Sequence, residues 1–247
     1  MTEQLSALVT GASRGIGFGI AERLASRGYA LTIAARDAAA LSETAGRLRA
    51  VGAPSVVEVP GDLADPDHTA ALARAHAQRF GHLSCLVLNA GVGTAGGISE
   101  FSPRRLDKTI AVNLRAPFVL LQHCLPLLRA AAGYDPNRGA RVIALASITG
   151  MFAESGLAAY GATKAALLSL VETLNVEESP RGVTATALAP GYVETDMTDW
   201  VRDQVPATEM IPVGDLVELV DAIISLSARS VVSRLVISRA GGPAYGA

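Results

Sequence analysis

The stretch Thr10-Gly11-Ala12-Ser13-Arg14-Gly15-Ile16-Gly17 joins a short apolar run, residues 5–9, to a segment with helical spacing. This order predicts a strand, a glycine-rich turn and a helix. Glycines let a ligand approach the backbone closely, and the free N–H groups at a helix start attract an anion such as a pyrophosphate. Three residues separate the first two glycines, so the G-x-G-x-x-G fingerprint is matched only approximately. The stretch indicates a nucleotide site, with a tight turn that binds nothing as the alternative.

Composition favours one α/β domain over residues 1–247, because half of the residues are hydrophobic and only 4% are aromatic. The net charge is −2 and no run of five like charges occurs, which argues against nucleic-acid and membrane-surface binding. We therefore expect a small-molecule substrate. Cys85 and Cys124 lie in apolar segments without metal-ligand spacing, so we expect core positions in a reducing compartment and no metal site.

The start of the chain predicts a cytoplasmic protein. Residues 1–4 carry no basic region followed by an apolar stretch, so no secretion signal is expected. The longest apolar run, 118–128, is interrupted by Gln122, His123 and Pro126 and is too short to cross a bilayer.

The end of the second predicted strand bears on cofactor choice. A helix at 16–27 and a strand at 29–35 complete a βαβ unit. After such a strand, an acidic side chain binds the ribose hydroxyls of NAD, whereas an arginine pairs with the 2′-phosphate of NADP. Arg36 stands there, and Arg14 adds a second cation at the same corner, while Asp37 fits as the cap of a following helix. We predict NADP(H) rather than NAD(H), with two solvated arginines as the alternative.

Two further strand ends carry polar residues. After a strand at 55–60, Asp62 either accepts a hydrogen bond from adenine or shapes the turn. A nearly all-apolar strand at 83–88, typical of a covered parallel strand, ends in Asn89-Ala90-Gly91. These small residues leave room for a ligand, and Asn89 alternatively bonds neighbouring strand ends together.

The middle of the chain predicts two helices between residues 99 and 128 that meet near Asn113, with Pro117 in the first turn of the second. This position favours a helix cap for Asn113. Residues 130–139 read as a polar loop, and a strand at 140–146 then places Ser147 at its carboxyl end.

Tyr160 and Lys164 follow in a helix that runs to about residue 178, and their i,i+4 spacing places them on one face. Of 21 basic residues only Lys108 and Lys164 are lysine. A compact ammonium beside a phenol cannot be exchanged for a guanidinium without changing the geometry. Lowering the pKa of a tyrosine from about 10 to about 7 takes about 4 kcal/mol, which a nearby lysine and an oxidised nicotinamide would supply.

These motifs resemble the short-chain dehydrogenase/reductase family, in the branch that includes the 3-oxoacyl-carrier-protein reductases. The resemblance covers nearly the whole chain. It implies a single doubly wound Rossmann-fold α/β domain, with a parallel sheet of about seven strands, helices on both faces and the site at the carboxyl ends of the strands. The motifs, in the family's order, are Thr10-Gly11-x-x-x-Gly15-x-Gly17, Asn89-Ala90-Gly91, Asn113, Ser147, Tyr160-x-x-x-Lys164 and Pro190-Gly191.

The resemblance implies four catalytic residues. Tyr160 is expected to protonate the carbonyl oxygen during reduction, and Ser147 to hydrogen-bond that oxygen. Lys164 is expected to bind the nicotinamide ribose and to lower the pKa of Tyr160. Asn113 is expected to hold a water that links Lys164 to solvent, which replaces the cap role.

The resemblance also implies the cofactor contacts. Asp62 and Leu63 are expected at adenine, and a strand at 184–189 is expected to deliver residues 190–195 to the nicotinamide. Residues 196–212 are expected to form a mobile substrate lid. The full expected cofactor set is Gly11, Ser13, Arg14, Gly15, Ile16, Gly17, Arg36, Asp62, Leu63, Asn89, Ala90, Gly91, Tyr160, Lys164, Pro190, Gly191, Val193 and Thr195.

The C-terminal region departs from the family pattern. A last helix at 215–228 and a strand at 234–238 are expected. Residues 232–234 stand where a glycine-containing turn is usual, and Arg239 stands where the strand usually continues with apolar or acidic residues. These departures put the C-terminal subunit contact in doubt. The resemblance and the apolar faces of the helices at 117–129 and 162–176 predict a homodimer or homotetramer.

The implied activity is NADP(H)-dependent interconversion of a ketone and a secondary alcohol, with 3-oxoacyl thioester reduction first and a polyol, steroid or xenobiotic ketone as alternatives. A cofactor-sensing or scaffolding protein would have lost the serine, tyrosine or lysine. A nucleotide-sugar epimerase would need a larger C-terminal domain. The histidines match no motif and are expected to be structural or solvated; they are His68, His76, His82 and His123.

Overall fold

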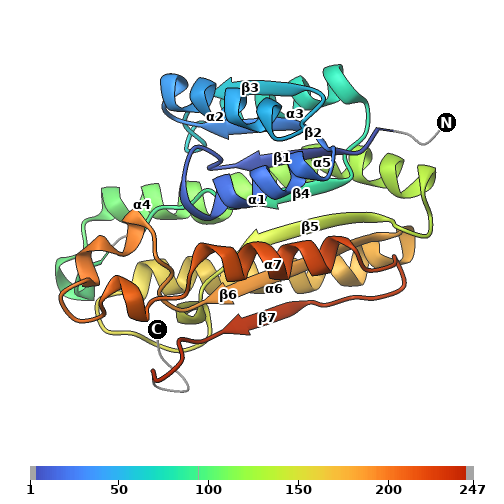
Figure 1. Cartoon of the computed structure of the whole chain (residues 1–247). Helices are drawn as coiled ribbons and strands as arrows, with labels where there is room; N and C mark the ends of the chain where they lie inside the picture. The colour runs from blue at the N-terminus through green and yellow to red at the C-terminus, as the bar shows by residue number, and fades with distance from the viewer. Residues whose placement is uncertain (1–3, 94, 243–247) are drawn as a thin grey trace.

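The computed structural model describes residues 4–93 and 95–242, which contain one seven-stranded parallel sheet (Figure 1). Its order is β3-β2-β1-β4-β5-β6-β7, which confirms the predicted doubly wound fold. The order reverses between β1 and β4, where such sheets open a crevice at the carboxyl ends of their strands. The strands are β1 (Ser6–Thr10), β2 (Ala30–Ala35), β3 (Val56–Pro60), β4 (Cys85–Leu88), β5 (Ala140–Leu145), β6 (Val183–Pro190) and β7 (Arg234–Ile237).

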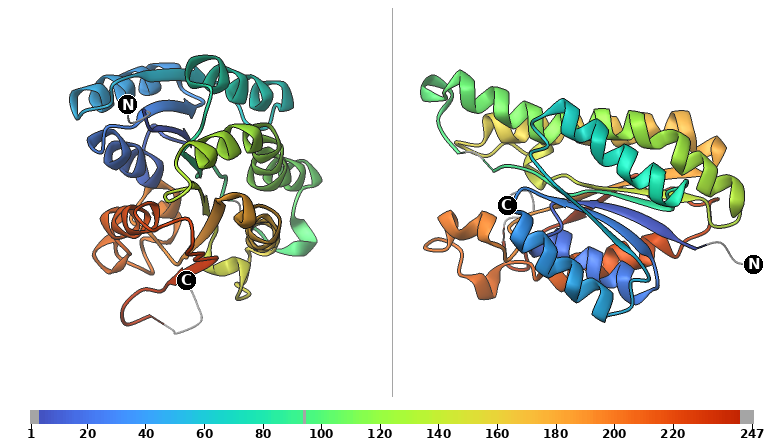
Figure 2. Two further views of the ribbon diagram at one scale, coloured as in Figure 1. Left: turned by 90° about the vertical axis from the view of Figure 1, so that its right-hand side faces the viewer. Right: turned by 90° about the horizontal axis from the view of Figure 1, so that it is seen from above.

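Helices cover both faces of the sheet (Figure 2). On one face lie α1 (Gly15–Ser26), α2 (Ala38–Ala50) and α7 (Val213–Ile224), and on the other lie α3 (Pro66–Phe80), α5 (Ala116–Tyr134) and α6 (Ala158–Glu178). Each face has its own apolar cluster, which contains Ile20, Leu41 and Val220 on the first face and Leu72, Leu120 and Leu167 on the second. Strands β1, β4, β5 and β6 are buried along their whole length.

Both cysteines lie in these clusters, as predicted. Cys85 on β4 and Cys124 on α5 are free and buried, and burial raises the pKa of each thiol to about 12. Such thiols are packing residues, because the reactive thiolate form is strongly disfavoured.

The segment between residues 99 and 139 differs from its prediction. Helix α4 (Pro103–Ile110) continues through a π-helical turn, Ala111–Arg115, into α5, which ends only at Tyr134. The predicted loop from 130 is wrong for its first five residues, because Ala131 and Ala132 pack into the core beside Leu128. The remaining loop is stabilised by Asp135, whose side chain accepts hydrogen bonds from the backbone of the next residues.

The helical run Pro103–Tyr134 is long and apolar enough to cross a membrane, judged by length and composition alone. It is longer than the apolar stretch 118–128 from which no span was predicted. Core helices pass the same test, and Leu121, Cys124 and Leu128 of this run are buried against the sheet.

Helices α1 and α6 follow their predictions closely. Asp37 caps α2, since its carboxylate accepts hydrogen bonds from the N–H groups of Ala39 and Ala40 at 2.9 and 3.1 Å. Helix α7 ends at Ile224, four residues earlier than expected.

Candidate active site

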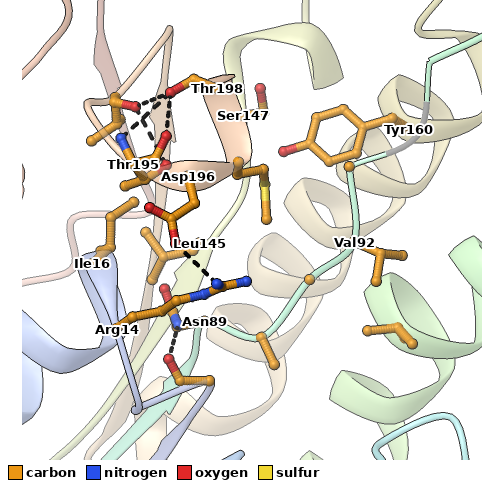
Figure 3. A pocket seen from close by; sticks show the side chains of 18 of the residues that line it. Arg14, Ile16, Asn89, Val92, Leu145, Ser147, Tyr160, Thr195, Asp196 and Thr198 are labelled. Atoms are coloured by element: carbon orange, nitrogen blue, oxygen red, sulfur yellow. Dashed lines mark hydrogen bonds and ion pairs between the residues drawn. The ribbon is translucent and has the colours of Figure 1, made fainter. Parts of the chain in front are cut away.

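A cleft of about 1040 Å³ opens at the carboxyl ends of the strands, across the point where the strand order reverses (Figure 3). Its walls come from the turns after β1, β2 and β4 on one side and from the ends of β5 and β6 with the start of α6 on the other. The cleft therefore brings together the glycine turn and the Ser147, Tyr160 and Lys164 cluster.

The glycine turn forms a cradle that side chains would fill. Gly11 and Gly15 have φ values of +65° and +56°, the left-handed region that favours glycine. A Cβ at Gly17 would lie 2.2 Å from the Gly11 carbonyl oxygen and 2.3 Å from Nδ2 of Asn89. No side chain of the described residues caps the start of α1, so its first N–H groups are available to an anion.

Asn89 fastens the end of β4 to the end of β1. Its Nδ2 donates hydrogen bonds to the carbonyl oxygens of Thr10 and Gly11 at 3.0 and 3.1 Å. The Thr10 hydroxyl in turn accepts from the backbone N–H groups of Asn89 and Ala90. The bonding of strand ends proposed as the alternative role of Asn89 is therefore present, and the residue also lines the cleft.

The corner after β2 holds Arg36 and the turn at Asp62. Arg36 is exposed, lines the cleft and forms no side-chain ion pair with any residue in the described parts of the chain. The Asp62 carboxylate accepts a hydrogen bond from the N–H of Ala64 at 2.9 Å, so it does shape the turn. Asp62 and Leu63 both line the cleft, where a contact with adenine stays a prediction.

Arg14 points toward Asp196 of the segment after β6 (Figure 3). Its guanidinium pairs with Asp196 at 2.9 Å, and both side chains are more than 60% exposed. The glycine turn is thereby linked to the first residue of the 196–212 segment.

Ser147 and Tyr160 face each other on the second wall (Figure 3). Ser147 follows β5, and its hydroxyl accepts a hydrogen bond from Oγ1 of Thr149 at 2.9 Å. Burial raises the pKa of Tyr160 to about 12; the hydrogen bond with Ser147 opposes this rise and the Glu154 charge adds to it. The phenol is therefore protonated at neutral pH.

Lys164 lies one helical turn after Tyr160 on α6. Its Nζ is buried, donates a hydrogen bond to the Leu145 carbonyl oxygen at 2.6 Å and lies 5.4 Å from the centre of the Tyr160 ring. Burial lowers the pKa of Lys164 to about 8. In this structure the pKa of Tyr160 is raised rather than lowered, and burial is the main cause. The predicted lowering also invokes an oxidised nicotinamide and stays open for the bound state.

Asn113 lies in the π-helical turn, so the cap prediction is wrong: the helix continues through it. Its side chain accepts a hydrogen bond from Val92 N–H at 2.8 Å and donates to the Val92 carbonyl oxygen at 3.1 Å and to Thr163 Oγ1 at 3.2 Å. Asn113 thus connects the loop after β4 to α6. Gly91 comes close as well, since a Cβ there would lie 3.6 Å from the Lys164 Nζ. A water held by Asn113 stays a prediction.

The segment after β6 returns to the glycine turn. Pro190, Gly191, Val193 and Thr195 all line the cleft, and the Thr195 methyl group lies 3.3 Å from the Cβ position of Gly15. The two ends of the 196–212 segment are pinned together, because Val193 and Ile211 form a parallel bridge with backbone hydrogen bonds on both sides.

Arg105 and Lys108 of α4 line the cleft and were not predicted. Tyr192, Met197 and Trp200 also line it and come from the predicted segments 190–195 and 196–212, although none of the three was predicted as an individual site residue. The rarity of lysine was the one available signal, and it pointed to Lys108 as well as to Lys164.

The C-terminal departures have structural roles. Arg234 on β7 pairs with Glu172 of α6. The Arg239 side chain is only 12% exposed, and its Nη1 lies 3.5 Å from Oε2 of Glu209. Arg239 thus links the chain after β7 to the 196–212 segment.

Two of the four histidines form a buried network outside the cleft. His76 on α3 bonds to Thr32 of β2 at 2.8 Å and to the His82 backbone at 2.9 Å. These contacts confirm a structural role for His76 and His82. No histidine of the described residues lines the cleft, and residues 4–93 and 95–242 contain no group of three potential metal ligands.

Residues 6–206 match the family described as short chain dehydrogenase. The chain belongs to the short-chain dehydrogenase/reductase family and is an oxidoreductase of that class.

Two relatives in sequence and one solved structure illustrate the similarity. A 3-oxoacyl-[acyl-carrier-protein] reductase of Staphylococcus aureus is 34% identical over 201 residues, covering 81% of this chain and 78% of the relative. A 2-(R)-hydroxypropyl-CoM dehydrogenase of Xanthobacter autotrophicus is 34% identical over 234 residues, covering 90% of each. The RhlG/NADP active-site complex of Pseudomonas aeruginosa has a TM-score of 0.85 and 30% identity, covering 96% of this chain and 94% of that one.

Proposed function

We propose that this chain is an NADP(H)-dependent reductase that converts a ketone to a secondary alcohol, with a 3-oxoacyl thioester as its substrate class. The observation that carries the proposal is the meeting of Ser147, Tyr160 and Lys164 on one wall of a cleft whose other wall is the glycine cradle. The name of the Staphylococcus aureus relative supports the acyl thioester.

The cleft fits a dinucleotide in shape and in charge. The cradle at Gly17 has no room for a side chain, and the start of α1 offers free N–H groups to the pyrophosphate. Arg36 provides a cation for a 2′-phosphate, Arg14 would add a second cation on leaving Asp196, and no acidic side chain follows β2 directly. The NADP in the Pseudomonas aeruginosa complex supports the same choice.

The side chains on the second wall divide the proton chemistry. The nicotinamide, when bound, supplies the hydride to the carbonyl carbon. Ser147 holds the carbonyl oxygen by a hydrogen bond, and the Tyr160 hydroxyl donates its proton to that oxygen. Lys164 supplies a positive charge next to the phenol, which stabilises the phenolate that remains after proton donation.

We also propose a domain organisation, a lid, a cellular location and an oligomeric state for this chain. One domain spans residues 1–247, and the 196–212 segment acts as a lid over the substrate. The protein works in the cytoplasm as a homodimer or homotetramer. Exposed apolar side chains on α5 and α6, such as Phe118 and Val176, support a contact between copies of this chain.

Replacing Tyr160 with phenylalanine tests the function. NADPH oxidation is followed with a panel of 3-oxoacyl thioesters and simple ketones, and NADPH binding is measured by fluorescence. The Tyr160→Phe variant should lose a factor of about 100 or more in turnover, because general acid catalysis contributes that much. NADPH affinity should change little. Full turnover in this variant would overturn the proposal.

A further inference from the structure

Glu154 connects the loop before Tyr160 to Tyr192, which lines the cleft. It belongs to the loop between Ser147 and Tyr160, and its Oε1 accepts a hydrogen bond from the Tyr192 hydroxyl at 2.5 Å. Its second oxygen, Oε2, is buried and has no hydrogen-bond partner among the described residues. Burying a carboxylate oxygen without a hydrogen-bond partner costs free energy, so this oxygen calls for an explanation.

Tyr192 connects this carboxylate to the lid. It follows β6 directly, and its ring packs edge-on against Trp200 at 6.1 Å between ring centres. Tyr192 also packs against the small apolar cluster of Val201, Val205 and Met210, which forms the interior of the lid. A contact made by the Tyr192 hydroxyl therefore fixes the lid relative to the Ser147 loop.

The phenols of Tyr160 and Tyr192 are both affected by the charge of Glu154. Ser147 lies at the Tyr160 hydroxyl and Lys164 near its ring, and the Glu154 charge adds to burial in raising the pKa of that phenol. Burial and Glu154 also raise the pKa of Tyr192, and Arg239 opposes that rise. Glu154 is thus the carboxylate that acts on both tyrosines.

We propose that Glu154 is a positioning residue for the reaction: it tethers the lid to the catalytic loop through Tyr192. The proposal rests on the proposed function of Tyr160 as the proton donor. The tether fixes the position of Trp200, which lines the cleft. The Glu154 charge adds to burial in favouring the protonated, donating form of Tyr160.

Two substitutions separate the tether from the charge. Glu154→Gln keeps an oxygen that accepts from Tyr192 and removes the charge. The reductive rate falls at high pH as Tyr160 ionises, and this fall should move to lower pH by about half a unit. Tyr192→Phe removes the tether and keeps the charge. It should raise KM several-fold and leave the position of this fall within about 0.2 pH unit of the unaltered protein.

The tether also has a readout that needs no activity. Trp200 is the single tryptophan of the chain, so its fluorescence reports the lid alone. Tyr192→Phe should change the emission maximum or the acrylamide quenching of Trp200, because the lid is released. Glu154→Gln should resemble the unaltered protein in this measurement.

Glu177→Gln is the matched control, because Glu177 is an exposed carboxylate on α6, the helix that carries Tyr160. It should shift neither the pH profile nor the fluorescence. Unchanged emission and quenching of Trp200 in Tyr192→Phe would overturn the proposal. If no ketone is reduced at all, the proposed function fails, and the Trp200 measurement still decides on the tether.

Discussion

Arg14 illustrates how one side chain can serve two partners. In the structure it pairs with Asp196 of the lid, while the proposed cofactor would place a 2′-phosphate near the same guanidinium. The pair is exposed, and such pairs contribute about 1 kcal/mol or less. A phosphate with two negative charges should therefore displace Asp196, and the lid contact should respond to the cofactor.

Removing Asp196 should strengthen NADPH binding selectively. In Asp196→Asn, Arg14 no longer has a competing carboxylate, so the Kd for NADPH should fall about 2- to 5-fold, as expected for the loss of an exposed pair. The Kd for NADH, which lacks the 2′-phosphate, should stay the same. Fluorescence titrations with both cofactors measure the two constants.

Asp199→Asn provides the control, since Asp199 is a lid carboxylate that pairs with Arg202 instead. Arg36→Asp should act in the opposite sense and weaken NADPH binding at least about tenfold, since a phosphate would then face a carboxylate. Equal effects of Asp196→Asn on NADPH and NADH would show that Arg14 does not reach the phosphate.

At the residue scale, the sequence predicted the members of the site whose role depends on backbone shape or on a fixed spacing. The glycine turn and the Tyr160–Lys164 pair belong to this class. Glu154 and its contact with Tyr192 were missed, because the two residues come from different segments and meet only through the tertiary path of the chain. No period or motif records such a contact.

At the element scale, the decisive feature is the close approach between the glycine turn and the β4 end. Gly17 lies in the first turn of α1, where a Cβ would come within 2.3 Å of the Gly11 carbonyl oxygen and of Nδ2 of Asn89. Gly46 in α2 is a glycine of the opposite kind, with no atom within 4 Å of a Cβ. The two positions form a matched pair for one substitution.

We expect Gly17→Ala and Gly46→Ala to differ in sign. Gly17→Ala should lower the free energy of unfolding by about 2 kcal/mol, because backbone must move to admit the methyl group. It should also abolish tight NADPH binding. Gly46→Ala should raise the free energy of unfolding by about 0.5–1 kcal/mol through helix propensity. Urea denaturation and NADPH titration provide both readouts. Normal cofactor affinity in Gly17→Ala would contradict the cradle.

Strands and most helices were predictable because their apolar periodicity and end signals are local. The π-helical turn at Ala111–Arg115 was not. Its extra residue is stabilised by the bonds of Asn113 to Val92 and Thr163, which lie on other elements. The sequence around Pro117 therefore suggested a break, where tertiary contacts keep the helix continuous.

On the scale of the whole molecule, the buried histidine network of His76 and His82 lies outside the cleft. His76 is fully buried between α3 and the sheet, and burial lowers its pKa to about 4. The unfolded chain protonates histidine near pH 6.5. Neutral His76 therefore makes its full contribution to the free energy of unfolding above pH 6.5. This contribution is lost as the pH falls toward 4, because the unfolded chain then binds a proton that the folded chain does not.

The loss amounts to at most about 3 kcal/mol between pH 6.5 and 4. Urea denaturation at several pH values should show a decline that flattens in His76→Gln. His123→Gln, at an exposed position on α5, is the control and should keep the decline. An equal decline in both variants would show that other groups set the acid sensitivity.

The parallel bridge between Val193 and Ile211 has a consequence for how this chain could change over evolution. Because the bridge pins the start and end of the lid side by side, the intervening residues form a closed loop attached at one point. Closing a longer or shorter loop costs little, about 0.6 kcal/mol for each doubling in length. The length and sequence of the lid can therefore change, and with them the substrate, while the sheet and the glycine cradle remain unchanged.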